Sequence, residues 1–116
     1  MRILLYGHAG WIGQKLADLL RQHDDVPLLG QARVDNPTHV LREIETLAPE
    51  RIICCVGRTH GPGCSTIDYL ERPGKLVDNV RDNLFAPLSL ALTCQAAGLH
   101  SVIAANMCKQ IVAFQA

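Results

Sequence analysis

The sequence begins with Arg2-Ile3-Leu4-Leu5-Tyr6, which is followed by Gly7-His8-Ala9-Gly10-Trp11-Ile12-Gly13. The first five residues are an apolar run of strand length, and the second stretch starts a helical pattern with glycines at three-residue steps. Glycine allows a tight turn, lets backbone approach a phosphate, and lets a helix pack closely on a strand. The amides of the first helical turn then face an anion. The stretch therefore predicts a strand–loop–helix unit that binds the pyrophosphate of a dinucleotide.

Strand and helix patterns alternate along the rest of the chain, as in a parallel sheet covered by helices. We expect strands over Arg2–Tyr6, Val26–Gly30, Arg51–Val56 and Ser101–Ala105, and helices over Trp11–His23, from Asn36-Pro37 to just before Pro49, and over Lys75–Ala97. This β-α-β-α-β-α-β order is the first half of a doubly wound fold. The predicted fold class is thus α/β and Rossmann-like, with a partial parallel sheet. We assign residues 1–105 to this domain and residues 106–116 to a divergent C-terminal tail.

Each predicted helix carries an apolar stripe that we expect to face the sheet. The stripes are Ile12, Leu16, Leu19 and Leu20 in the first helix, Val40, Leu41, Ile44 and Leu47 in the second, and Val77, Val80, Leu84, Leu88, Ala91 and Leu92 in the third. Pro87 interrupts the third helix, because it cannot donate a hydrogen bond to the carbonyl of Asn83. The interruption either frees polar groups at Asn83 for a water or a neighbouring loop, or merely bends the helix around the sheet.

The composition excludes several classes of protein. The 116 residues are 48% hydrophobic and 19% charged, which fits one ordinary soluble domain. Lys plus Arg and Asp plus Glu both number 11 and no basic run occurs, so we expect neither nucleic acid nor an anionic membrane as a partner. No apolar stretch approaches the ~20 residues that span a bilayer. The start reads as a strand and not as a signal peptide, so the expected location is the cytoplasm.

The five cysteines include no C-x-x-C pair, and we interpret them as reduced cytosolic residues. Cys54 and Cys55 are adjacent in a predicted strand, so their side chains should point to opposite faces of the sheet. They cannot hold one metal ion together, and no metal site is predicted.

Three segments together resemble a known enzyme family. They are Gly7-x-x-Gly10-x-x-Gly13, then Gly57-Arg58-Thr59-His60-Gly61-Pro62-Gly63-Cys64-Ser65-Thr66-Ile67-Asp68-Tyr69-Leu70-Glu71, and Asp78-Asn79-Val80-Arg81-Asp82-Asn83-Leu84. The first has the glycine spacing of extended short-chain dehydrogenases/reductases. Together they are similar to the bifunctional 3,5-epimerase/4-reductases that convert a UDP- or dTDP-linked 4-keto-6-deoxy sugar to rhamnose in plants and some large DNA viruses. The resemblance covers about residues 1 to 100, and only the NAD(P)-binding half of such an enzyme.

The resemblance implies a cofactor site and part of a sugar site. The implied cofactor-binding residues are Gly7, Gly10, Trp11, Ile12, Gly13, Arg33, Gly57, Arg58, Thr59 and Asn83, and the implied substrate-binding residues are His60, Gly61 and Ser65. Arg33 follows the second strand, where an arginine favours the 2′-phosphate of NADPH over the free hydroxyl of NADH. Asp35 argues for the opposite preference. Without the resemblance, Arg33 could equally be a surface residue and His60 an ordinary loop histidine.

One catalytic feature of the family is missing from this chain. Reductases of this kind use a Tyr-x-x-x-Lys pair to exchange a proton with the substrate. The two tyrosines here, Tyr6 and Tyr69, are followed four residues later by Gly10 and Pro73. The likeness also fades from about Ala104. We therefore assign no catalytic residue.

Three functional hypotheses stay open at this point. The chain could be a truncated NADP-dependent nucleotide-sugar epimerase/reductase that keeps dinucleotide binding, with the nucleotide sugar bound only if the missing half is supplied. It could be a non-catalytic regulator that pairs with a full-length enzyme, or with itself, through an exposed sheet edge or the long helix. It could also be a short redox sensor that binds NAD(P) without turnover.

Overall fold

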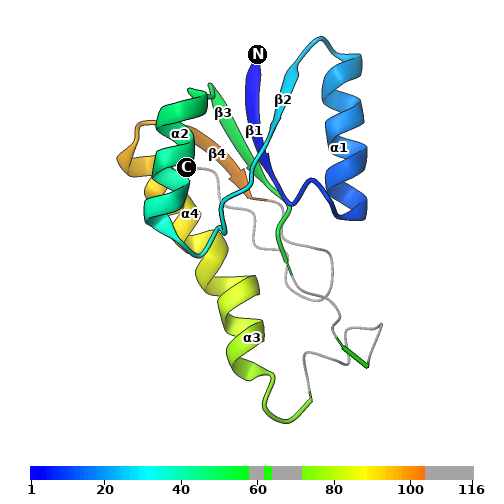
Figure 1. The fold of residues 1–116 in the computed structure, drawn as a ribbon, viewed down its shortest axis with the longest axis vertical. Helices are drawn as coiled ribbons and strands as arrows, with labels where there is room; N and C mark the ends of the chain where they lie inside the picture. Colours follow the sequence, from blue (N-terminus) through cyan, green and yellow to red (C-terminus); the bar gives the residue numbers. More distant parts are fainter. Residues whose placement is uncertain (58–61, 64–71, 104–116) are drawn as a thin grey trace.

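A parallel sheet forms the centre of the computed structural model, which describes residues 1–57, 62–63 and 72–103 (Figure 1). The strands are β1 (Arg2–Tyr6), β2 (Val26–Leu29), β3 (Arg51–Cys54) and β4 (His100–Ile103). They lie in the order β2-β1-β3-β4, and every pair is parallel. The predicted α/β fold with a partial Rossmann-like sheet is confirmed. The tail over residues 106–116 lies outside the described residues.

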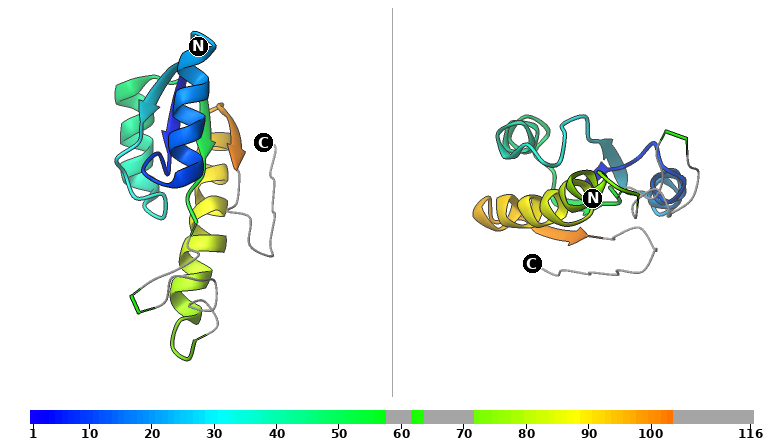
Figure 2. Two further views of the ribbon diagram at one scale, coloured as in Figure 1. Left: turned by 90° about the vertical axis from the view of Figure 1, so that its right-hand side faces the viewer. Right: turned by 90° about the horizontal axis from the view of Figure 1, so that it is seen from below.

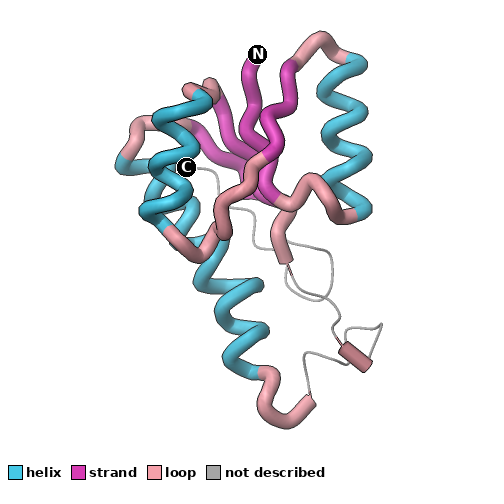
Figure 3. The backbone as a smooth tube through the Cα atoms, in the orientation of Figure 1, coloured by secondary structure: helices cyan, strands magenta, loops and turns pink. Residues whose placement is uncertain are grey.

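Helices cover both faces of the sheet (Figures 2 and 3). They are α1 (Trp11–Gln22), α2 (Pro37–Leu47), α3 (Leu76–Val80), the π-helical turn η2 (Arg81–Phe85) and α4 (Ala86–Ala96). Helix α1 packs on one face, and α2 and α4 pack on the other. The elements α3, η2 and α4 follow one another without a break and form one long helix. Its α3 end extends past the carboxyl ends of the strands in Figure 1. The long helix therefore flanks the carboxyl edge of the sheet.

The core has one cluster of buried side chains on each face of the sheet. The larger cluster joins the sheet to α2 and α4, and comprises Leu4, Tyr6, Val34, Val40, Ile44, Ile52, Cys54, Ala86, Leu90 and Cys94. The smaller cluster joins the sheet to α1 through Leu5, Ala17 and Cys55. Cys54 and Cys55 thus face opposite ways, as predicted. Burial raises the pKa of the Cys54 thiol to about 12 and also raises that of Cys55, so both stay protonated near neutral pH.

The start of α2 shows why this helix forms where the sequence predicts it. The side-chain oxygen of Asn36 accepts a hydrogen bond from the backbone N–H of His39 at 3.2 Å, and Pro37 occupies the first turn. The helix ends at Ala48 in the left-handed conformation, just before Pro49. The predicted cap is confirmed.

The apolar stripe predicted for the long helix is wrong except at Ala91, which packs against the core. Leu84, Leu88 and Leu92 are exposed, and Val77 is 73% exposed. The side of α4 that faces the sheet comprises Ala86, Pro87, Leu90 and Cys94. Helix α4 is apolar around its whole circumference, so hydrophobic periodicity could not tell which side is buried. The π-helical turn η2 adds to the error, because an extra residue per turn shifts the phase of the pattern.

The π-helical turn η2 lies where Pro87 leaves the carbonyl of Asn83 without its usual helical donor. The stripes of the first two helices also needed correction at one position each, since Leu19 and Leu41 are exposed. Ile12, Leu16, Val40, Ile44 and Leu47 pack against the core as predicted.

Two leucines of α4 that lie two positions apart test which side of this helix packs against the sheet. Leu90 is fully buried and Leu92 is 58% exposed. Leu90→Ala should lower the free energy of unfolding by about 2–5 kcal/mol, because it leaves a cavity in the core. Leu92→Ala should change it by less than about 0.5 kcal/mol. Urea denaturation of the two variants measures the difference, and equal losses would contradict the packing described here.

Candidate functional site

A cleft of about 440 Å³ opens at the carboxyl ends of β1, β2 and β3. Its lining includes Gly7, Gly30, Arg33, Asp35, Gly57 and Asp82. The strand order reverses at β1, which has β2 on one side and β3 on the other. In open parallel sheets ligands bind beyond the strand ends at such a reversal. The cleft therefore lies where this fold binds nucleotides, and it brings together the predicted residues Gly7, Arg33 and Gly57.

Two glycines of the first loop are required by the fold itself. Gly7 has φ +83°, and a β-carbon there would lie 2.8 Å from the carbonyl carbon of Cys55. A β-carbon on Gly13 would lie 1.9 Å from the carbonyl oxygen of Gly7. Any side chain at Gly13 would thus push α1 away from the end of β1. The close packing of strand and helix predicted from the glycine spacing is present.

Gly10 differs from the other two glycines. Its φ of −75° is open to any residue, and an added β-carbon would only reach ordinary contact, 3.5 Å from the carbonyl oxygen of Gly7. The fold therefore leaves room for a side chain at this position. Close approach of another molecule to the backbone would favour glycine here.

The amino-terminal end of α1 suits an anion. Gly10 is its N-cap, and neither a side-chain cap nor an acidic residue of the first turn balances the positive end of the helix dipole. The indole of Trp11 is 74% exposed, with the Lys15 ammonium 4.7 Å from the ring centroid. The predicted contribution of Trp11 and Ile12 is their backbone N–H groups, which belong to this first turn.

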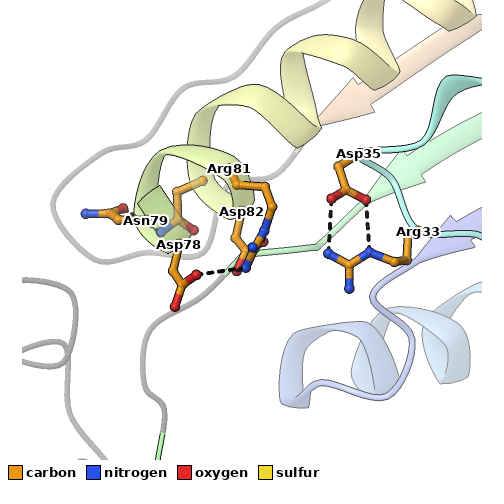
Figure 4. A network of polar contacts seen from close by, with 7 residues as sticks. Arg33, Asp35, Asp78, Asn79, Arg81 and Asp82 are labelled. Carbon is orange, nitrogen blue, oxygen red and sulfur yellow. Dashed lines mark hydrogen bonds and ion pairs between the residues drawn. The ribbon is translucent and has the colours of Figure 1, made fainter. Parts of the chain in front are cut away.

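An ion pair stands at the β2 side of the cleft (Figure 4). Arg33 donates from Nε to Asp35 at 3.1 Å and from Nη2 at 3.0 Å. These hydrogen bonds hold the pKa of Asp35 below its usual value and raise the pKa of Arg33. The Arg33 side chain is 70% exposed, whereas that of Asp35 is 18% exposed. Two of the five guanidinium N–H groups are used, so the Nη1 end can still bind an oxyanion.

A second set of charges stands on the long helix. Arg81 pairs with Asp82 through Nε at 2.9 Å and with Asp78 through Nη2 at 3.2 Å (Figure 4). Asp82 lines the cleft, and the predicted residue Asn83 follows it and donates to the side chain of Asn79 at 2.8 Å. Our sequence interpretation did not single out Asp82. The i, i+3 spacing of Asp78 and Arg81 is typical of a helical ion pair, and it is the sequence signal that could have pointed to this group of charges.

Tyr6 and Gly30 form the floor of the cleft. A β-carbon on Gly30 would lie 2.5 Å from the Tyr6 ring, so the two residues are in close contact. The Tyr6 hydroxyl donates to Glu43 at 2.8 Å, and burial together with this carboxylate raises its pKa far above the usual value. Tyr6 therefore stays protonated and engaged, which leaves it unsuited to exchange protons with a substrate.

Several residues implied by the family resemblance lie outside the described residues. They are Arg58, Thr59, His60, Gly61 and Ser65.

Comparisons with known proteins identify relatives in rhamnose synthesis. The chain is 48% identical over 100 residues to protein L780 of Acanthamoeba polyphaga mimivirus, which covers 86% of this chain and 35% of L780. The crystal structure of the L780 UDP-rhamnose synthase matches with a TM-score of 0.88 and 45% identity, over 93% of this chain and 38% of that chain. A bifunctional dTDP-4-dehydrorhamnose 3,5-epimerase/dTDP-4-dehydrorhamnose reductase of Arabidopsis thaliana is 29% identical over 105 residues, 90% of this chain and 33% of that protein.

The chain is homologous to part of these rhamnose-synthesis enzymes. It spans about a third of the length of these curated relatives. A dTDP-4-dehydrorhamnose reductase from Bacillus anthracis, solved in complex with NADP, shares the fold with a TM-score of 0.71 and 17% identity, over 86% of this chain and 34% of that chain. No protein-family model matches the chain. Among the described residues, no helix has the length and apolar character needed to cross a bilayer.

The Arg33–Asp35 pair can be tested by titration. Arg33→Ala removes the hydrogen bonds that hold the pKa of Asp35 down, so this pKa should rise toward the ordinary value. The native pair contributes stability above the ordinary aspartate pKa, and this contribution is lost as the pH falls through the lowered one. NMR titration of the Asp35 carboxyl carbon measures the change. Arg21→Ala, which breaks a separate pair with Asp18, is the control and should leave Asp35 unaffected.

Proposed function

We propose that this chain binds NADPH in the cleft as the cofactor-binding part of a nucleotide-sugar epimerase/reductase of rhamnose synthesis. The observation that carries the proposal is Gly10, where the fold would accept a side chain but the sequence has none. This glycine lies at the uncapped start of α1, beside a cleft at the carboxyl edge of the sheet. A pyrophosphate needs close backbone approach and the amides of a first helical turn, and this loop offers both.

The roles of the residues follow from the same placement. Gly7, Gly10 and Gly13, with the amides of Trp11 and Ile12, hold the pyrophosphate. Gly57, with Arg58, Thr59 and Asn83, belongs to the cofactor site, and His60, Gly61 and Ser65 contact the nucleotide sugar. These sugar contacts and the residues after Gly57 rest on the family resemblance.

Arg33 supports NADPH over NADH. Its guanidinium is at the cleft, and the Nη1 end is not used by the hydrogen bonds to Asp35. A planar fork of donors suits the 2′-phosphate that distinguishes the two coenzymes. The paired Asp35 reduces the net positive charge there, so we expect the preference to be moderate.

The bound cofactor would supply hydride to the sugar, and a protein group would have to exchange the matching proton. Tyr6 is buried and engaged with Glu43, and no Tyr-x-x-x-Lys pair occurs in the sequence. The proposed role of this chain is therefore to hold the cofactor. The remainder of a full-length enzyme would complete the binding site for the nucleotide sugar and provide the group that exchanges the proton. The proposed compartment is the reducing cytosol, in keeping with Cys54 and Cys55, which form no disulfide.

Substitution of Gly10 tests the proposal. Gly10→Val should leave the chain folded, with a loss of about 1 kcal/mol because valine is a poorer N-cap than glycine. It should reduce NADPH affinity at least about tenfold, because the side chain would occupy the space of the pyrophosphate. Fluorescence titration with NADPH and circular dichroism measure the two effects. Leu92→Ala, on the outer side of α4, is the matched control with full binding. Retained NADPH affinity in a folded Gly10→Val protein would contradict the proposal.

A second candidate function is pairing through the long helix. The described residues of this helix expose large apolar side chains between Leu76 and Leu88, and we take these as the pairing surface: Leu76, Val77, Val80, Leu84, Phe85 and Leu88. Val80, Leu84 and Leu88 follow one another at four-residue steps, and an exposed apolar stripe of this kind usually marks a site of contact with another protein. We infer that the same face of a second copy, or of a full-length relative, packs against it.

Sedimentation of the purified chain tests this pairing. We expect a dimer for the natural sequence and a monomer for Leu88→Arg, because a buried unpaired charge would oppose the contact. Leu41→Arg places the same charge at an exposed leucine of α2 and should leave the dimer intact. A natural chain that stays monomeric at every concentration would exclude the second function without affecting the first.

A further inference from the structure

One carboxylate joins three elements beneath the cleft. Glu43 of α2 accepts a hydrogen bond from the backbone N–H of Gln31 at 2.7 Å and another from the N–H of Ala32 at 3.2 Å. It also accepts from the Tyr6 hydroxyl at 2.8 Å. Helix α2, the end of β1 and the segment after β2 are therefore tied together at a single side chain.

The segment after β2, residues 30–35, carries the Arg33–Asp35 pair. Its first amide, that of Gly30, donates to the Leu5 carbonyl at 2.9 Å and so continues the pairing of β2 with β1. The next two amides, those of Gln31 and Ala32, donate to Glu43 instead of to a strand. A carboxylate forms strong hydrogen bonds with backbone amides. Glu43 thus replaces the sheet as the support of this segment, one residue before Arg33.

Tyr6 holds Glu43 in turn. Its ring is fully buried against Gly30, and its hydroxyl fixes one carboxylate oxygen. Both oxygens of Glu43 are then engaged, so the carboxylate keeps a single orientation. The position of Arg33 is set through this chain of contacts from the core to the rim of the cleft.

We propose that Glu43 is a positioning residue for the choice between NADPH and NADH. It holds residues 30–35 so that the free end of the Arg33 guanidinium meets the 2′-phosphate. Recognition by a planar fork needs close geometry, and a small displacement of the backbone weakens it. The adenine, the pyrophosphate and the nicotinamide are common to both coenzymes and do not depend on this fork. This inference rests on the proposed cofactor binding.

The test is the ratio of the dissociation constants of NADH and NADPH, measured by fluorescence titration. Glu43→Gln keeps the size of the side chain but replaces one acceptor oxygen with a donor, so one of the contacts is lost. We expect the preference for NADPH to fall about fivefold, with NADH affinity nearly unchanged. Glu45→Gln, on the exposed side of the same helix, should leave the ratio unchanged. Arg33→Ala should remove the preference for NADPH altogether, and its ratio of dissociation constants gives the largest change that any variant of this site can show.

Amide hydrogen exchange gives a second readout without coenzyme. The amides of Gln31 and Ala32 should exchange faster in Glu43→Gln than in the natural protein, and those of β1 should not. Tyr6→Phe removes only the hydroxyl contact and keeps the ring on Gly30, so it should give a smaller fall in the ratio and serves if Glu43→Gln fails to fold.

Equal weakening of both coenzymes, or an unchanged ratio in a folded variant, would overturn the role of Glu43. These results differ from failure of the proposed function, in which the natural protein binds neither coenzyme and both proposals fall. Faster exchange of Gln31 and Ala32 with an unchanged ratio would show a structural contact alone, and it would also overturn the inference.

Discussion

The first turn of α1 lies against the end of β1 so closely that Gly13 has no room for a side chain beside the Gly7 carbonyl. This contact sets the direction in which α1 leaves the sheet, and it brings the positive end of the helix to the strand edge. Because β2 and β3 flank β1, their carboxyl ends open onto the same place. The cleft, its glycine loop and the charged residues around it all depend on this close packing of α1 against the end of β1.

The charges around the cleft are arranged in pairs. Arg33 is held by Asp35 on the β2 side, and Arg81 is held by Asp82 and Asp78 on the long helix. Arg33 lines the cleft where a phosphate-bearing ligand is proposed, but Asp35 already neutralises part of its charge, and Arg81 adjoins the cleft only through its partner Asp82. Such a site discriminates by the geometry of its donors more than by net charge. This is why the support that Glu43 gives to residues 30–35 matters for function as well as for folding.

The sequence allowed the strands, the capped start of α2 and the glycine loop to be predicted, because each depends on local chemistry such as the Asn36 cap or the spacing of Gly7 and Gly13. It did not allow the buried side of α4 to be predicted, since apolar residues surround that helix and η2 shifts its phase. Glu43 was also missed, because its partners Tyr6 and Gln31 are brought to it only by the fold. The distinction between Gly10 and the glycines at positions 7 and 13 likewise depends on contacts that only the fold creates.

The central claim is that the amides at the start of α1 hold a diphosphate. A crystal structure of this chain soaked with NADP⁺ tests it most directly. The account predicts the diphosphate against the backbone N–H groups of Trp11 and Ile12, over Gly10, with the 2′-phosphate beside Arg33. A diphosphate bound elsewhere, or none in a crystal whose cleft is open to solvent, would contradict it.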